Sequence, residues 1–149
     1  MKITRGGRLS GDLTTDVARL TSSSEHDHYI ADDVIEINIA HTLMLVKAGY
    51  LAPAEGKALV CALKPLIGKI SAVPPEMEDV HMVIEEEVTK AVGAEIGGKM
   101  HTGKSRNDQV ATALRMRLRS YLIEICSRIS DLQAALNEKA SESSDIIIP

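Results

Sequence analysis

The stretch from Gly97 to Val110, GGKMHTGKSRNDQV, holds the residues of this chain best suited to bind an anion. It combines three glycines, two lysines, one arginine and one histidine, and it stands directly before a long run with helical apolar periodicity. Backbone N–H groups at a helix start lack internal partners, and the peptide dipoles point positive charge outward there. The stretch therefore predicts a flexible loop that binds a carboxylate or phosphate at the start of a helix.

Four side chains of this loop are candidate ligand-binding groups. Arg106 offers a planar fork of donors that matches a carboxylate. Asn107 is expected to cap the helix and to present its amide to a ligand, while Thr102 and Ser105 add hydroxyl groups. The glycines permit close backbone approach. The alternative is a solvated loop with an Asn cap and a surface arginine, and the residues alone leave both interpretations open.

A second cluster lies at Ser22-Ser23-Ser24-Glu25-His26-Asp27. Ser22 and Glu25 have the spacing of a capping box, so a helix is expected to begin here. The three serine hydroxyls at this helix start are candidates for ligand contact. Simple capping of the helix is the favoured interpretation from the residues alone.

A third cluster runs from Glu78 to Glu85. Asp79 suits a helix N-terminus, because its charge complements the helix dipole. His81 and Glu85 are four residues apart and share a helix face, as an acid–base pair or two metal ligands would. The further ligands that a metal needs are not visible, so no metal is expected and a structural role is favoured. His101, in the glycine-rich loop, is the better chemical candidate of the two histidines.

The elements that must position these residues are all predicted to be helices, so the fold class is all-α. Residues 1–21 are expected to form an extended arm with one helical turn near Asp16–Leu20. Helices are predicted from Ser22 to a stop at Gly49, from Pro53 to Ile70 with an interruption at Pro65, from Asp79 to Gly93, and from Asn107 to about Ser141. The last is about 50 Å long at about 1.5 Å per residue, which exceeds a compact domain and predicts a bundle shared between subunits.

Composition narrows the possible partners and location. The chain of 149 residues is 44% hydrophobic and 26% charged, as expected of a globular domain with an aliphatic core. Its net charge of −4 argues against general affinity for nucleic acid. No membrane-spanning run or signal core is present, so a cytoplasmic protein without membrane contact is expected. Cys61 and Cys126 are predicted to be small buried residues in a reducing compartment.

The segment His101-Thr102-Gly103-Lys104-Ser105-Arg106-Asn107-Asp108-Gln109-Val110 resembles the first signature segment of the argininosuccinate lyase family, part of the fumarase/aspartase superfamily. Other pieces agree in order and spacing: Gly6-Gly7-Arg8, Ser23 with Asp27, and Glu78-Asp79-x-His81 with Glu85. One departure is Lys104, which stands where the family usually has arginine. Lysine keeps the charge of arginine but loses the fork of donors.

The resemblance implies a reversible elimination that splits argininosuccinate into arginine and fumarate, in a homotetramer whose active sites each gather segments from three subunits. It implies an N-terminal helical domain at 1–106 and the start of a central helical bundle at 107–149. The implied substrate-binding residues are Ser23, Ser105, Arg106 and Asn107, with Asp27, Thr102, Asp79 and His81 as weaker candidates.

The resemblance also implies what this chain does not carry. The family continues past the equivalent of Pro149 with further segments, and these hold the residues assigned to proton transfer. Separately, the apolar end at 145–149 suggests a chain cut from something larger. No catalytic residue and no cofactor are therefore expected within the 149 residues, and the isolated chain is predicted to be inactive. The alternative is a non-catalytic helical assembly protein, since lens crystallins resemble this lyase.

Overall fold

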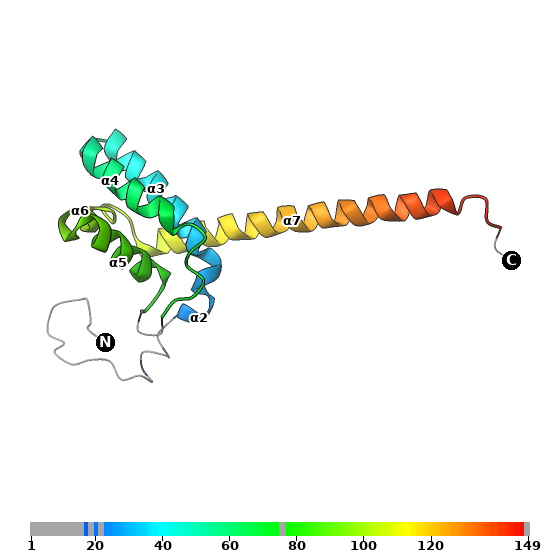
Figure 1. The fold of residues 1–149 in the computed structure, drawn as a ribbon, viewed down its shortest axis with the longest axis horizontal. Coiled ribbons are helices and arrows are strands. Elements are labelled where there is room, and N and C mark those ends of the chain that lie inside the picture. Colours follow the sequence, from blue (N-terminus) through cyan, green and yellow to red (C-terminus); the bar gives the residue numbers. More distant parts are fainter. Residues whose placement is uncertain (1–16, 18–19, 21–22, 75–76, 148–149) are drawn as a thin grey trace. The chain divides into compact units, whose positions relative to one another are not determined.

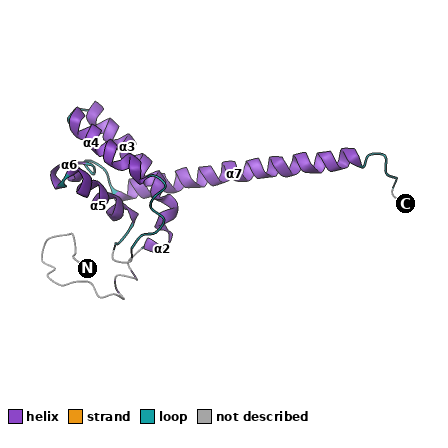
Figure 2. Cartoon of the chain, viewed as in Figure 1, coloured by secondary structure: helices purple, strands orange, loops and turns teal. Residues whose placement is uncertain are grey.

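A computed structural model describes residues 17, 20, 23–74 and 77–147. Within this part of the chain every regular element is a helix, which confirms the all-α prediction (Figures 1 and 2). No helix in the described residues is long and apolar enough to cross a membrane. The chain divides into two units, Met1–Leu114 and Arg115–Pro149, each described below by itself. The proposed domain boundary between residues 106 and 107 remains a prediction.

The first predicted helix forms as three consecutive pieces: α2 (Ser24–Asp27), a 3₁₀ turn η1 (His28–Ile30) and α3 (Ala31–Lys47). It stops at Gly49, whose φ of 79° is the left-handed conformation that favours glycine, as predicted. The expected capping residue Ser22 lies outside the described residues. Of the predicted arm at 1–21, only Val17 and Leu20 are described, and both are helical.

The second helix, α4 (Pro53–Leu63), begins at proline as predicted. The backbone N–H of Ala52 donates to Glu55 Oε2 at 3.0 Å, which ties down the first turn. The α-helix ends at Leu63 and is followed by the 3₁₀ turn η2 (Lys64–Leu66), so the expected continuation to Ile70 is wrong. Pro65 has no N–H to donate to the preceding turn, and the chain leaves the helix there.

The third helix, α5 (Val80–Val92), ends at Gly93 with φ 84°, again as predicted. A short helix that the sequence did not predict follows at once: α6 (Ala94–Lys99) occupies part of the expected flexible loop. It packs beside α5 (Figure 1), and a Cβ added to Gly97 would lie only 2.6 Å from Thr89 Oγ1. The close approach of Gly97 therefore serves helix packing rather than a ligand.

The core of the unit Met1–Leu114 is aliphatic, as the composition predicts. Fully buried side chains from α3, α4 and α5 meet there, and Met100 and Ala113 complete it; the most deeply buried include Val34, Ile35, Leu59, Leu63, Val80, Ile84 and Val88. The prediction for the cysteines is wrong, because Cys61 and Cys126 are both exposed. Cys61 lies on α4 but outside the buried set of Gly56, Leu59 and Leu63.

The last helix, α7 (Arg106–Glu142), has 37 residues and matches the predicted span to within one residue at each end. Its first turns belong to the unit Met1–Leu114, where Gln109 and Ala113 are buried. The part within Arg115–Pro149 exposes a stripe of apolar side chains at spacings of three and four: Leu118, Leu122, Ile125, Ile129, Leu132 and Leu136. This stripe has the repeat that packs against other helices.

Candidate functional site

The centre of the candidate site is Asp79, the N-cap of α5. One carboxylate oxygen accepts a hydrogen bond from the backbone N–H of Met82 at 2.9 Å. The other accepts from Arg106 Nη1, also at 2.9 Å, whereas Glu78 Oε2 lies farther from that nitrogen at 3.8 Å. The Asp79 side chain is 15% exposed and that of Arg106 34% exposed, so the pair is partly shielded from water. Asp79 therefore caps a helix and orients a guanidinium at the same time.

A second carboxylate meets the same helix start. Asp27 Oδ2 accepts from the backbone N–H of Val80 at 3.1 Å and from Ser23 Oγ at 2.8 Å. The backbone N–H of Ser23 in turn donates to the Glu78 carbonyl at 3.2 Å. The fold thus joins Ser23, Asp27, Asp79 and Arg106, which come from three separate stretches of the sequence, in one polar network at the N-terminus of α5.

His81 lies beside this network on α5 and is only 3% exposed. Neither ring nitrogen has a hydrogen-bond partner among the described residues. Burial lowers the pKa of His81 below its usual range; the charges of Arg106 and Lys104 act in the same direction, while Asp79 and Asp27 oppose it. A neutral imidazole is thereby favoured at neutral pH.

One interpretation of their spacing required His81 to pair with Glu85, and the structure does not show this pair. Glu85 Oε2 instead lies 3.3 Å from His101 Nε2, though without hydrogen-bond geometry. Burial lowers the pKa of His101, assisted by the positive charge of Lys104 and opposed by Glu85. At neutral pH the contact therefore joins a neutral imidazole to a carboxylate. No cluster of three or more metal-ligating side chains occurs in the described part of the chain.

Ser105 rather than Asn107 caps the start of α7, which corrects the prediction. Ser105 Oγ accepts from the backbone N–H of Asn107 at 2.9 Å, and Ser105 N donates to Asp108 Oδ2 at 3.4 Å. The helix begins one residue earlier than expected, so Asn107 lies in its first turn with an exposed side chain. Its amide is available to a ligand because the capping role has passed to Ser105.

Two polar residues of α3 that the sequence did not single out hold this loop, the buried Asn38 and the partly buried His41. Asn38 on α3 accepts at Oδ1 from Lys104 Nζ and, at 3.0 Å, from Gln109 Nε2. Nearby, His41 Nε2 donates to the carbonyl of Thr102 at 2.9 Å, so this candidate residue is held by its backbone. Burial lowers the pKa of Lys104 to about 8, with Glu85 opposing the shift. Asn38 could have been found from the sequence, because it is a polar residue on the mostly apolar face of α3.

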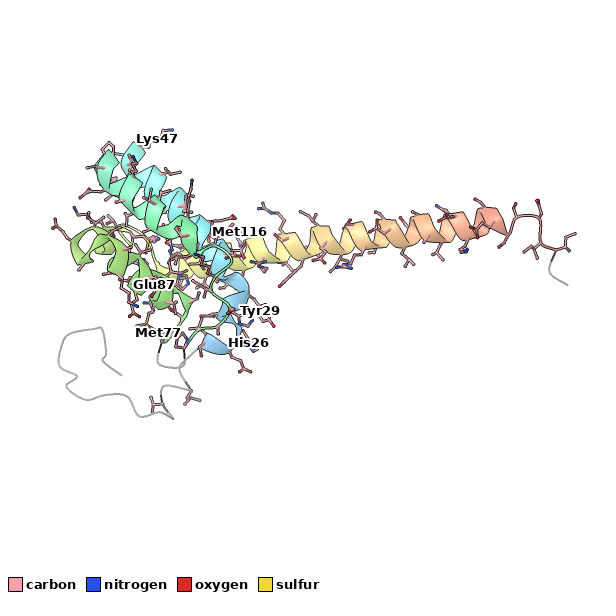
Figure 3. The ribbon with its side chains drawn as sticks, viewed as in Figure 1. His26, Tyr29, Lys47, Met77, Glu87 and Met116 are labelled. Carbon is pink, nitrogen blue, oxygen red and sulfur yellow. The ribbon has the colours of Figure 1, made fainter. Side chains whose placement is uncertain are left out.

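A cavity of about 560 Å³ opens on the side of α5 next to this network. Arg106 lines it together with residues of α5 and with Met77, which comes just before α5 in the chain and is labelled in Figure 3. The full lining is Met77, Met82, Glu85, Glu86, Thr89, Lys90 and Arg106. Charged side chains of both signs and two methionines surround the space.

Comparison with known proteins gives consistent relatives. The lyase family matches residues 7–149 of the chain. The argininosuccinate lyase of Methanococcus maripaludis is 37% identical over 150 residues, and that of Azotobacter vinelandii is 40% identical over 148 residues. The argininosuccinate lyase of Methanocaldococcus jannaschii is 36% identical over 151 residues.

These similarities cover nearly all of this chain but a small share of each relative. The matches span 97–99% of the chain and only 31–32% of the three relatives. The chain therefore corresponds to about a third of the length of the proteins it matches. Gly6-Gly7-Arg8, the N-terminal part of the resemblance, lies outside the residues that the structure describes.

Proposed function

We propose, from the premise that this chain belongs to the lyase family, that it forms the N-terminal part of an argininosuccinate lyase. The reaction is the reversible elimination of argininosuccinate to arginine and fumarate. The observation that carries the proposal is the placement of Arg106. It stands at the first residue of α7, fixed by Asp79 and bordering the cavity, with Asn107 exposed beside it. This arrangement presents fixed donors to a carboxylate.

The charge pattern of the site fits the charge pattern of this substrate. Argininosuccinate combines carboxylates with a cationic guanidinium group. Arg106 and the donors at the start of α7 suit the carboxylates, because a guanidinium and helix N–H groups both favour anions. The carboxylate of Asp27 suits the cationic portion, whereas that of Asp79 holds Arg106 in place. We assign substrate binding to Ser23, Ser105, Arg106 and Asn107, with Asp27, Thr102, Asp79 and His81 in supporting roles.

The elimination needs two kinds of help. A base removes the proton beside a carboxylate, and the resulting carbanion spreads its charge onto that carboxylate while an acid assists departure of the guanidinium nitrogen. Preorganised donors where this charge develops lower the barrier, and Arg106 with Asn107 suits that task. We place the acid and the base on segments that follow Pro149 in the family. The 149 residues by themselves are then expected not to turn over the substrate.

The oligomeric state and location follow the same proposal. We propose a cytoplasmic homotetramer in which α7 joins a central bundle and each active site is completed by segments of other subunits. The exposed apolar stripe of α7 supports this, because a single copy leaves it uncovered. The partners are then the small-molecule substrate, its products and further copies of the chain. No nucleic acid or membrane enters the proposal.

The proposal is tested by following fumarate release from argininosuccinate by ultraviolet absorbance, using the protein as its gene encodes it. Arg106→Lys keeps the charge but loses the bidentate fork, so we expect kcat/KM to fall about tenfold or more. The matched control is Arg128→Lys, since Arg128 is an exposed arginine of α7 paired with Glu124 at 2.6 Å. Such pairs contribute little, so the control should stay within about twofold of wild type.

Two outcomes would contradict the proposal. Equal rates for Arg106→Lys and Arg128→Lys would remove Arg106 from the site. No turnover of argininosuccinate by a well-folded protein that includes the segments placed after Pro149 would reject the enzyme and favour a non-catalytic helical assembly protein of the same superfamily.

A further inference from the structure

One buried oxygen atom holds both ends of the segment Ser105–Asp108. Asn38 is only 1% exposed and lies on the core-facing side of α3. Its Oδ1 accepts from Lys104 Nζ, immediately before the segment, and from Gln109 Nε2, immediately after it. Between these two anchors stand the residues to which the proposed function assigns substrate binding. The pose of that segment therefore depends on a helix that contributes none of those residues.

The two donors have strong physical reasons to keep this acceptor. Gln109 is only 2% exposed, and its own Oε1 has no hydrogen-bond partner among the described residues. Lys104 is partly buried, and burial depresses the pKa of its ammonium to about 8. Buried donors left without an acceptor are costly, and a charged donor more so than a neutral one. Without the Asn38 oxygen, both groups gain by moving toward water and carrying the segment with them.

The other attachments in this region do not replace this one. His41 reaches the carbonyl of Thr102, which is earlier in the loop. Arg106 is held by Asp79 through the tip of a long side chain, so that contact fixes the guanidinium and not the backbone of the segment. Lysine at position 104, where the family usually has arginine, donates from one compact ammonium, so a single acceptor atom suffices.

We propose that Asn38 is a positioning residue that fixes the substrate-binding segment Ser105–Asp108 from within α3, through Lys104 and Gln109. This inference rests on the proposed function for the reaction it serves. The tether itself has a readout that does not need turnover, namely hydrogen exchange of the segment's backbone amides. Ser105, Asn107 and Gln109 all donate backbone N–H bonds within the segment, so loosening exposes these amides to exchange.

The experiment compares three variants in the protein as its gene encodes it. Asn38→Ala removes the shared acceptor, Asn38→Asp retains an acceptor oxygen of the same reach, and Thr42→Val is the matched control. Thr42 is fully buried one turn further along α3, and its hydroxyl bonds only to the Asn38 carbonyl of its own helix among the contacts described. Each variant is measured for KM and kcat with argininosuccinate, and for deuterium uptake in peptides covering 100–110.

For Asn38→Ala we expect KM to rise about tenfold while kcat falls less, and exchange in 100–110 to accelerate about tenfold while α4 peptides keep their rates. In Asn38→Asp, KM and the exchange rate in 100–110 should return most of the way to their wild-type values. Thr42→Val should resemble wild type in both measurements. A merely structural role would reduce the folded fraction, lowering kcat at unchanged KM. If Asn38→Ala does not fold, Lys104→Met removes one of the two tethers without leaving a buried charge, and should raise KM about threefold.

The failure of the tether and the failure of the proposed function are distinguishable. Unchanged KM together with loop exchange no faster than in Thr42→Val overturns the role of Asn38. An absence of turnover in a wild-type protein that includes the segments placed after Pro149 rejects the proposed function instead, and the exchange rates alone then support or overturn the tether.

Discussion

At the scale of single residues, Asp79 links the start of a helix to the loop that binds the ligand. Its two carboxylate oxygens are divided between the Met82 amide and the Arg106 guanidinium. A carboxylate that accepts hydrogen bonds on both oxygens is held in one orientation, and so is the arginine it contacts. The same contact sets the position of the only arginine in the signature segment.

His81 next to this pair makes the stability of the protein depend on pH. Burial lowers its pKa in the folded state, so the unfolded chain binds the proton first as the pH falls through about 6.5. Stability is therefore highest above that pH and is lost as the pH falls toward the lowered folded pKa. His101 shifts in the same direction and adds to the slope. We expect the free energy of unfolding to decrease between pH 7 and pH 5.

Urea unfolding at several pH values checks this expectation. His81→Gln removes one of the two histidines whose pKa is lowered by burial, so the slope in this window should fall by up to about 1.4 kcal/mol per pH unit without vanishing. The matched variant His26→Gln makes the same substitution at an exposed histidine on α2, and its slope should fall less than that of His81→Gln. An unaltered slope in His81→Gln would show that His81 is not held neutral by burial.

At the scale of elements, α6 packs closer to α5 than a larger residue at position 97 would permit. Gly97 faces Thr89 of α5, where an added Cβ would lie 2.6 Å from the hydroxyl oxygen and 3.1 Å from the backbone Cα. Both distances are shorter than an ordinary contact, so the added methyl group of Gly97→Ala should push α6 away from α5. Since His101 and Lys104 follow α6 directly, this displacement also reaches the candidate site.

The adjacent glycine supplies a matched control for this packing. Gly98 also lies in α6, but an added Cβ would meet nothing within 4 Å. We expect Gly97→Ala to lower the free energy of unfolding by about 1–3 kcal/mol through overpacking. Gly98→Ala should raise it by about 0.5–1 kcal/mol, because alanine has the better helix propensity. Equal effects in thermal or urea unfolding would contradict the close approach of α6 to α5.

At the scale of the whole molecule, the exposed stripe of α7 is the largest feature that a single copy leaves unexplained. Its side chains in Arg115–Pro149 are about half exposed or more, for example 58% for Leu118 and 60% for Leu136. The alternating spacing of three and four residues is the repeat by which helices pack side by side. An uncovered stripe of this length favours association between chains, as the proposed bundle requires.

Sedimentation velocity tests this association. We expect the protein to sediment as an oligomer, and Ile125→Asp to shift it toward smaller species, because a carboxylate in the middle of the stripe cannot be buried without a partner. Ser127→Asp places the same charge two residues further along α7, away from the stripe, and should leave the distribution unchanged. A wild-type protein that stays monomeric at high concentration would refute the predicted bundle.

The sequence by itself determined the helices and the identity of the candidate residues. Helical periodicity, Pro53, Gly49 and Gly93 set most element boundaries, because these signals act within a few residues of the chain. The uninterrupted run after Asn107 predicted α7 almost completely. The signature segment pointed to Arg106 and to the family. The local sequence did not predict α6, because its glycines are poor helix formers. They form a helix here because the small size of Gly97 lets α6 pack against α5.

Only the tertiary structure decided how those residues meet. No spacing along the chain joins Asp27 to the Val80 amide, or Lys104 to Asn38, because each pair lies more than 50 residues apart. Ser105 and not Asn107 is the cap because of where α7 begins after the loop. Cys61 is exposed because another face of α4 meets the core. Local patterns encode which helix forms, whereas packing between helices selects which side chains share a site.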